Sequence, residues 1–335
     1  MNGCLLGIEN LSVTFRTPEG VARAVDRVSF ALERGETLGV VGESGCGKTV
    51  TSLSILGLIP SPSGAIESGR ILFEDRDLLT LGPEALRGIR GRDISMIFQE
   101  PLTSLNPVLP IGRQVAEPLM VHRGLPKAQA LDQAGEWLER VKIPAARRRL
   151  YDYPHQLSGG MCQRVMIAMA MVCRPKLLIA DEPTTALDVT IQAQILSLMV
   201  GLKEETGTSL LLITHNLGVV AQMASRVVVM YAGQVAEEAR AADLFDRPFH
   251  PYTQGLLHSM PRLGSRKAGR SRRLREIPGI VPAITAAIAG CKFAERCPHA
   301  FDLCREKPPE FLNIRPGQRA RCWLKEFPER RRGDG

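Results

Sequence analysis

The sequence predicts an α/β protein built on a mostly parallel sheet, and three observations carry this prediction. Residues 36–59, ETLGVVGESGCGKTVTSLSILGLI, have the pattern of a strand, a glycine-rich loop and a helix. Short apolar runs at 176–183, 207–216 and 226–236 have the length of buried strands, and the first follows a segment of helical character. Strands that alternate with helices favour a parallel sheet with helices on its faces.

The remaining segments attach to this core. Residues 5–34 alternate roughly between apolar and polar types around the turn sequence TPEG, which predicts an antiparallel β subdomain with a hairpin. Apolar residues at helical spacing predict a helical insert at about 100–156 within a core domain of residues 1–247. A basic, proline-containing linker is expected at 248–282, and a small Cys-rich C-terminal extension at 283–335.

Charge and hydropathy restrict the class of protein. The net charge of the 335 residues is +8, and seven Lys or Arg residues fall between positions 262 and 275. Such a run is typical of a solvated linker, with contact to anionic lipid headgroups as the functional alternative. No apolar run is long enough to span a bilayer, and the N-terminus lacks the features of a secretory signal, so we expect a cytosolic chain.

The glycine-rich loop matches the pattern G-x-x-x-x-G-K-[ST], and we call it the phosphate loop. Its glycines allow backbone N–H groups to surround phosphate oxygens, while Lys48 reaches the β- and γ-phosphates and Thr49 faces Mg²⁺. These properties predict ATP binding. The residues expected to contact ATP here are Gly42, Glu43, Ser44, Gly45, Cys46, Gly47, Lys48, Thr49 and Val50. Because Cys46 lies near a helix N-terminus and Lys48, we expect a lowered thiol pKa.

Two carboxylates follow the apolar run LLIA. Asp181 is placed to hold Mg²⁺, and Glu182 is placed to polarise the attacking water. A second glycine-rich helix start, QLSGGMCQR, offers another group of free N–H donors near Ser158, Gly159, Gly160 and Met161. A single bound ATP does not need two such groups of N–H donors from one chain.

These motifs together resemble the nucleotide-binding subunits of ABC transporters, whose signature LSGGQ binds the ATP held by a partner subunit. The resemblance implies an ABC-type P-loop NTPase core. It also implies roles for Gln99 of the Q-loop as a catalytic residue and Mg²⁺ ligand, for Asp188 of the D-loop, and for the switch histidine His215 as a catalytic residue. Phe15 resembles the aromatic residue that stacks on adenine, although a strand residue in the core would look the same.

A narrower resemblance is to the dipeptide and oligopeptide importers. Met161 in place of the signature glutamine is shared with that subfamily, as are the stretches FQEPLTSLNP, YPHQLSGGM and HPYTQGLLHSMP. The resemblance implies an ATP-hydrolysing subunit at the cytoplasmic face of the inner membrane. Its partners would be a second ATPase subunit, identical or similar, two permease subunits and a solute-binding protein. Nickel or glutathione remains an alternative cargo, and nothing explains Cys162.

A different class, the non-transport ABC ATPases that act on nucleic acid, is disfavoured by the layout of the chain. Only about 110 residues separate Lys48 from Ser158, without the long coiled coils of chromosome-type members. The chain carries one cassette, unlike translation-type members, and its cysteine cluster follows the cassette, whereas repair-type members interrupt it. We therefore expect no nucleic-acid partner.

Four cysteines near the C-terminus need their own explanation: Cys291, Cys297, Cys304 and Cys322. A reducing cytosol disfavours disulfides. The gaps of five, six and seventeen residues lack the short C-x₂₋₄-C pairs usual for structural zinc. A [4Fe–4S] cluster takes four thiolates and would stabilise a small extension. The subfamily resemblance, in which some members bind this cluster, favours the same assignment, with Zn²⁺ and unliganded thiols as alternatives.

Overall fold

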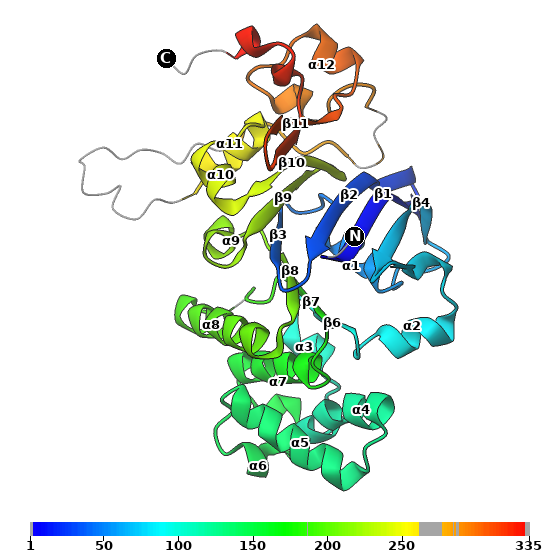
Figure 1. The fold of residues 1–335 in the computed structure, drawn as a ribbon, viewed down its shortest axis with the longest axis vertical. Helices are drawn as coiled ribbons and strands as arrows, with labels where there is room; N and C mark the ends of the chain where they lie inside the picture. The colour runs from blue at the N-terminus through cyan, green and yellow to red at the C-terminus, as the bar shows by residue number, and fades with distance from the viewer. Residues whose placement is uncertain (1–2, 186, 261–276, 284, 286–287, 332–335) are drawn as a thin grey trace, which may run out of the picture.

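The computed structural model describes residues 3–185, 187–260, 277–283, 285 and 288–331. Its long axis runs from a C-terminal extension through two β-sheets to a group of helices at the opposite end (Figure 1). The basic run predicted between positions 262 and 275 lies outside the described residues. In the described part of the chain, no helix has the length and hydrophobicity needed to cross a membrane.

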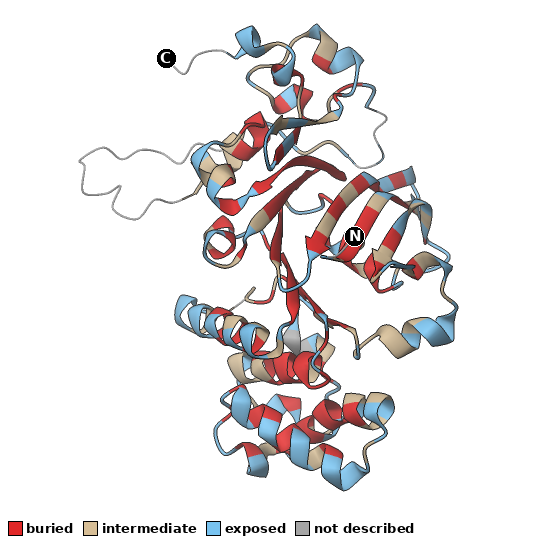
Figure 2. Ribbon diagram, in the orientation of Figure 1, coloured by how far each residue is buried: buried red, intermediate tan, exposed pale blue. Residues whose placement is uncertain are grey.

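The main sheet has eight strands in the order β11-β12-β10-β9-β3-β8-β7-β6. Five of them, from β9 to β6, are parallel, as the alternation of strands and helices predicts. The five parallel strands are β3 (Thr37–Val41), β6 (Ile94–Ile97), β7 (Leu177–Asp181), β8 (Ser209–Ile213) and β9 (Arg226–Tyr231). Nearly every residue of these strands is buried, which explains their continuous apolar sequence (Figure 2).

The second sheet is antiparallel and has the order β2-β1-β4-β5. Its strands are β1 (Cys4–Thr17), β2 (Gly20–Glu33), β4 (Gly64–Phe73) and β5 (Arg76–Asp77). The hairpin turn between β1 and β2 falls at the predicted TPEG sequence. Apolar residues of this sheet share one core cluster with α1 (Lys48–Ile55) and with one face of the parallel strands.

The helices at the lower end of Figure 1 form the predicted insert. They are α4 (Ile111–Arg123), α5 (Lys127–Arg140) and α6 (Ala146–Arg149), while the short helix α3 (Pro101–Ser104) lies on the other side of α7. Together with α7 (Gly159–Met171) and α8 (Val189–Thr206) they enclose a second core cluster. The insert therefore packs on the sheet through α7, which contacts β6.

The C-terminal extension is part of the main sheet. The hairpin β11 (Phe311–Arg315) and β12 (Gln318–Arg321) pairs through β12 with β10 (Gln234–Arg240). Within the segment predicted as a linker, residues 251–258 form α11 (Pro251–His258). The remaining α-helices of the described residues are α2 (Pro83–Ile89), α9 (Leu217–Met223), α10 (Ala241–Asp246) and α12 (Asp302–Glu306). The sequence pattern did not reveal that the extension shares the sheet.

Candidate nucleotide site

The phosphate loop connects β3 to α1, as the strand, loop and helix pattern predicts. All three of its glycines have positive φ, with values of 154° at Gly42, 77° at Gly45 and 98° at Gly47. A Cβ at Gly42 would lie 2.2 Å from the carbonyl oxygen of Met230, and one at Gly47 would lie 2.4 Å from that of Ala24. These positions therefore require glycine for both conformation and space.

Lys48 is the first residue of α1 and is buried. Its Nζ donates to the carbonyl oxygens of Gly42 at 2.8 Å and Glu43 at 3.1 Å. The ammonium group thus lies against the concave backbone of the loop. A phosphate entering the loop would meet a positive charge that is already in place.

The surroundings of Cys46 contradict the prediction that its thiol pKa is lowered. The residue is 1 % exposed, and burial raises the pKa of its thiol even though the nearby Lys48 charge acts in the opposite direction. The Sγ atom lies 3.7 Å from Lys48 Nζ. The expectation of a lowered thiol pKa was wrong because desolvation outweighs the lysine and the helix N-terminus.

Asp181 ends β7 beside the phosphate loop and is 2 % exposed. Thr49 donates a hydrogen bond to its carboxylate, while Oδ1 has no hydrogen-bond partner among the described residues. Burial raises the pKa of this carboxyl group, and the Thr49 hydrogen bond acts in the opposite direction. A buried carboxylate oxygen without a partner, next to a threonine hydroxyl, is a donor set that fits Mg²⁺.

Glu182 and His215 lie together at the carboxyl ends of β7 and β8, which are neighbours in the sheet. His215 Nδ1 lies 2.8 Å from the Glu182 carboxylate, and the backbone N–H of His215 donates to Oε1 at 3.1 Å. Thr185 donates to Oε2 at 3.2 Å. Glu182 has φ of 52°, a conformation that is costly outside glycine and is often found at functional sites.

The two other residues predicted to contact the nucleotide or its metal are Gln99, after β6, and Phe15, on β1. Gln99 is exposed and follows β6, which pairs with β7, so it lies at the same end of the sheet as Asp181. Phe15 is partly buried on β1, opposite Gly64 of β4. A Cβ at Gly64 would lie 2.7 Å from the Phe15 ring, so the ring packs closely on the β4 backbone.

The signature residues begin α7, and Asp188 begins α8. Ser158 caps α7 by accepting from the N–H of Met161 at 3.4 Å, and Asp188 caps α8 by accepting from that of Ile191 at 2.9 Å. Ser158 is exposed. α7 packs on β6 and on helices of the insert, whereas α1 packs on β2 and β7. The signature and the phosphate loop thus belong to different parts of the fold.

The four C-terminal cysteines come from separate short segments of the extension. The N–H of Cys291 donates to the carbonyl oxygen of Cys304 at 2.7 Å. Burial raises the pKa of Cys291 to about 11 and those of Cys297 and Cys322 to about 12, and the other cysteines in the group act in the same direction. Within the described residues, however, no group of three or more His, Cys, Asp or Glu is arranged to hold a metal ion. The structure therefore does not support the predicted cluster or zinc site.

Two contacts of the phosphate loop could not be predicted from the sequence. Arg296 of the extension forms an ion pair with the Glu43 side chain, and Tyr252 of α11 accepts from its N–H. The sequence stretch HPYTQGLLHSMP marks the position of Tyr252 but does not indicate what it contacts. No local spacing relates Arg296 to Glu43.

Comparison with known proteins identifies the class that this fold and site define. The family model "ABC transporter" matches residues 25–185, and the model "Oligopeptide/dipeptide transporter, C-terminal region" matches residues 236–304. The chain belongs to the ABC transporter family and carries its ATP-hydrolysing cassette.

Individual relatives match over nearly the whole chain. It is 51 % identical to the oligopeptide transport ATP-binding protein AppD of Bacillus subtilis, over 96 % of this chain and 97 % of AppD. It is 50 % identical to the dipeptide transport ATP-binding protein DppD of the same organism, over 96 % and 95 %. Among solved structures, a dimeric post-hydrolysis state of the ATP-binding cassette MJ0796 with ADP and phosphate matches with a TM-score of 0.63. That match has 28 % identity and covers 70 % of this chain and 98 % of the cassette.

Proposed function

We propose that this chain binds and hydrolyses ATP to power the import of dipeptides or oligopeptides through partner subunits in the inner membrane. One observation carries the catalytic part of the proposal. The strand ends of the parallel sheet bring Asp181, Glu182 and His215 to the edge where the phosphate loop presents Lys48. The match of the C-terminal region to peptide transporters supports the cargo.

Each residue at this edge has a role that its surroundings favour. Lys48 and the loop N–H groups bind the β- and γ-phosphates, and Thr49, Asp181 and Gln99 hold Mg²⁺. The Mg²⁺ ion, when bound, neutralises charge on the phosphates. Glu182 accepts a proton from the attacking water as general base. His215 holds the Glu182 carboxylate at 2.8 Å and, being largely exposed, is accessible to the γ-phosphate.

We infer that the complete site needs a second ATPase subunit. The signature residues Ser158, Gly159, Gly160 and Met161 begin a helix of the insert half, with Ser158 exposed toward solvent. A head-to-tail dimer would place this helix start against the ATP of the partner, where its free N–H groups stabilise negative charge. The Asp188 loop would lie at the same interface. The dimeric cassette MJ0796 provides a precedent among similar folds.

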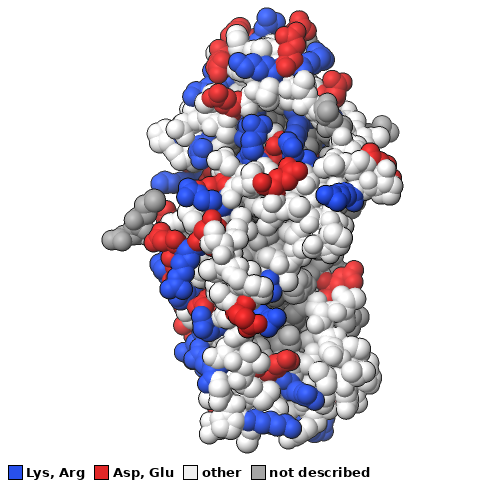
Figure 3. All heavy atoms as spheres, turned by 90° about the vertical axis from the view of Figure 1, so that its right-hand side faces the viewer, with Lys and Arg blue, Asp and Glu red and all other residues white. Residues whose placement is uncertain are grey.

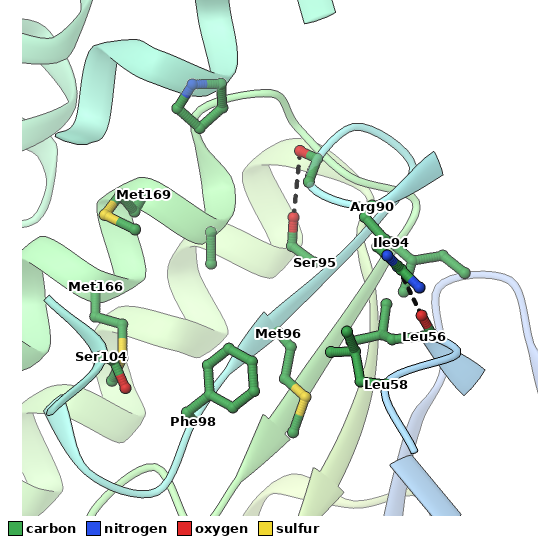
Figure 4. A pocket seen from close by; sticks show the side chains of 13 residues that line it. Leu56, Leu58, Arg90, Ile94, Ser95, Met96, Phe98, Ser104, Met166 and Met169 are labelled. Atoms are coloured by element: carbon green, nitrogen blue, oxygen red, sulfur yellow. Dashed lines mark hydrogen bonds between the residues drawn. The ribbon is translucent and has the colours of Figure 1, made fainter. Parts of the chain in front are cut away.

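The permease subunits would contact the boundary between sheet and insert. A hollow of about 250 Å³ opens there, lined by side chains from β6, α7 and the segment after α1. Met96, Phe98 and Met166 give it an apolar wall, and Phe98 is 40 % exposed immediately before Gln99 (Figure 4). A short helix of a membrane subunit would bury this surface, and its movement would reach the nucleotide through Gln99. Such a contact would hold the subunit peripherally at the cytoplasmic face of the membrane.

Other cargoes and nucleic acid find less support. The names of AppD and DppD describe oligopeptide and dipeptide transport, and nothing in the chain indicates nickel or glutathione in preference. Lys and Arg are interspersed with Asp and Glu on the face shown in Figure 3, without the single-sign surface expected of a nucleic-acid groove.

The test is purification of the native complex through a tagged copy of this chain. We expect two membrane subunits and a second ATPase subunit, either this chain or a paralogue, to co-purify. The solute-binding protein encoded with them should bind peptides in calorimetric titrations. Recovery of the chain without membrane subunits, or a binding protein that takes nickel or glutathione and no peptide, would contradict the proposal.

The four-cysteine cluster is a separate proposal. The proposal rests on the sequence, whose gaps of five, six and seventeen residues suit zinc less well than a [4Fe–4S] cluster, in which each thiolate would bind a different iron. Cys291, Cys297 and Cys304 each act to raise the pKa of Cys322, which supports the grouping of the four thiols. Anaerobic purification followed by iron and zinc analysis and absorbance near 400 nm tests this. A colourless protein without iron would refute it.

A further inference from the structure

The phosphate loop is held from outside by the C-terminal extension. Arg296 forms a two-pronged ion pair with Glu43, the second residue of the loop, although 253 positions separate them. Its Nη1 lies 2.6 Å from Oε2, and its Nη2 lies 3.0 Å from Oε1. The Arg296 side chain is 6 % exposed and that of Glu43 is 26 % exposed. Bidentate pairs of this kind are among the stronger hydrogen-bonded contacts in proteins.

The guanidinium of Arg296 is fixed in its direction. Nε donates to the carbonyl oxygen of Pro278 at 3.0 Å, Nη2 to that of Ile277 at 3.3 Å, and Nη1 to the hydroxyl of Tyr231 at 3.3 Å. With the two bonds to Glu43, these contacts employ all five N–H donors of the side chain. Arg296 is therefore a rigid support and cannot turn toward another anion without losing several hydrogen bonds.

Glu43 is held at its backbone as well. Its N–H donates to the hydroxyl of Tyr252 at 2.9 Å, and Tyr252 is fully buried on α11. The Tyr252 ring packs against Tyr231 and Phe293, with ring centres 4.6 and 5.4 Å apart. Both the side chain and the main chain of Glu43 thus depend on residues that follow the ATPase core in the sequence.

An unpaired carboxylate in this position would weaken ATP binding. Glu43 is the only acidic residue between Gly42 and Thr49, the segment that must receive a polyphosphate with several negative charges. An unpaired carboxylate there would repel the phosphates and compete for Lys48. Arg296 neutralises Glu43 and holds the carboxylate toward the extension. The loop then presents the charge of Lys48 to the ligand.

We propose that Arg296 is a positioning residue for ATP, which tunes the affinity of the phosphate loop by neutralising and orienting Glu43. This inference rests on the proposed function, namely that the loop binds ATP. It makes the C-terminal extension a functional part of the nucleotide site. If Arg296 only anchored the extension, the affinity for ATP would not depend on the charge of Glu43.

The experiment measures the affinity of the full chain for MgATP and MgADP by equilibrium titration. In Arg296→Gln we expect ATP affinity to fall about 30-fold, as for one uncompensated charge roughly 8 Å from a phosphate at an effective dielectric constant of about 20. The loss should be smaller for ADP, which carries less charge. Adding Glu43→Gln to Arg296→Gln should restore ATP affinity to within about threefold of wild type, because it removes the unpaired charge.

Two further variants separate charge from anchoring. Arg296→Lys keeps the charge with fewer hydrogen bonds, so its ATP affinity should stay within about fivefold of wild type. Arg321 is the matched control because its Nε also ties the extension to the core, through the carbonyl oxygen of Val235, while its Nη1 donates to that of Pro309 within the extension. Arg321→Gln should bind ATP as wild type does.

Several results would overturn the inference. Unchanged ATP affinity in Arg296→Gln would do so, as would a loss that Glu43→Gln does not reverse or that is equal for ATP and ADP. If Arg296→Gln does not fold, the test uses Arg296→Lys instead. A fall in ATP affinity of 30-fold or more in the folded Arg296→Lys variant would show that the charge of residue 296 is not what supports ATP binding. A wild-type chain that binds no ATP would refute the proposed function itself, and the inference with it.

Discussion

We predict that the stability of this chain falls at acidic pH because His250 is buried in its neutral form. It precedes α11 and caps it, with Nδ1 accepting from the N–H of Tyr252 at 3.0 Å. The side chain is buried beside the Phe293 ring. Burial lowers the pKa of His250 to about 4 from its ordinary value of 6.5. The imidazole is therefore neutral in the folded protein, and protonation would remove the cap and bury a charge.

The sign and size of the effect follow from this shift. Above pH 6.5 both the folded and the unfolded chain carry neutral His250, and its contribution to the free energy of unfolding is complete. As the pH falls from 6.5 toward about 4, the unfolded chain gains a proton that the folded chain does not, so stability is lost. Each pH unit costs about 1.4 kcal/mol, which gives a loss of about 2 kcal/mol between pH 7.5 and pH 5.

The assay is urea unfolding of the wild type and of His250→Asn at pH 7.5 and pH 5. Asparagine also caps helices but does not titrate, so the variant should lose about 2 kcal/mol less than the wild type over this interval. His122, whose pKa burial also lowers, titrates in both proteins and cancels in the comparison. Equal losses in the two proteins would refute the assignment of a buried, neutral His250.

The remaining predictions concern the nucleotide site. Lys48→Ala should weaken ATP binding at least tenfold in equilibrium titrations because the loop loses its charge to the phosphates, and unchanged affinity would contradict this role. Ser158→Arg should leave the affinity for ATP of its own chain unchanged but lower ATPase activity at least tenfold in the assembled complex, because the signature acts on the partner's ATP. Full activity would argue against the sandwich. Maleimide should label Cys46 slowly in the folded chain, since it is buried with a raised pKa, and faster after unfolding in urea at the same pH; equal rates would contradict that burial.

Much of the site could be predicted because its parts are local in the sequence. The order of strand, glycine-rich loop and helix fixes the position of Lys48, and the apolar run before Asp181 indicates that a buried strand delivers this residue. Neighbouring parallel strands end at the same edge, which brings Glu182 and His215 together. The period of the apolar residues also predicts the helical insert and the first hairpin.

Other features depend on packing between distant segments. The Arg296–Glu43 pair joins residues 253 positions apart, and no pattern near either residue indicates the other. The pairing of β12 with β10 likewise leaves no mark in the spacing of the extension. For Cys46 the neighbouring charge was visible in the sequence but the burial was not, so the direction of the pKa shift was predicted wrongly.

In the proposed function, ATP hydrolysis with Glu182 as general base powers peptide import. The complex purified through this chain would be reconstituted in proteoliposomes, with ATP on the side of the ATPase subunits and the solute-binding protein loaded with peptide on the other. We expect ATP-dependent peptide accumulation by the wild type. Glu182→Gln should bind ATP normally but lower both turnover and accumulation by at least about a hundredfold, the effect expected for losing a general base. Accumulation at the wild-type rate by Glu182→Gln, or ATP turnover by the wild type without any peptide accumulation, would contradict the proposed function.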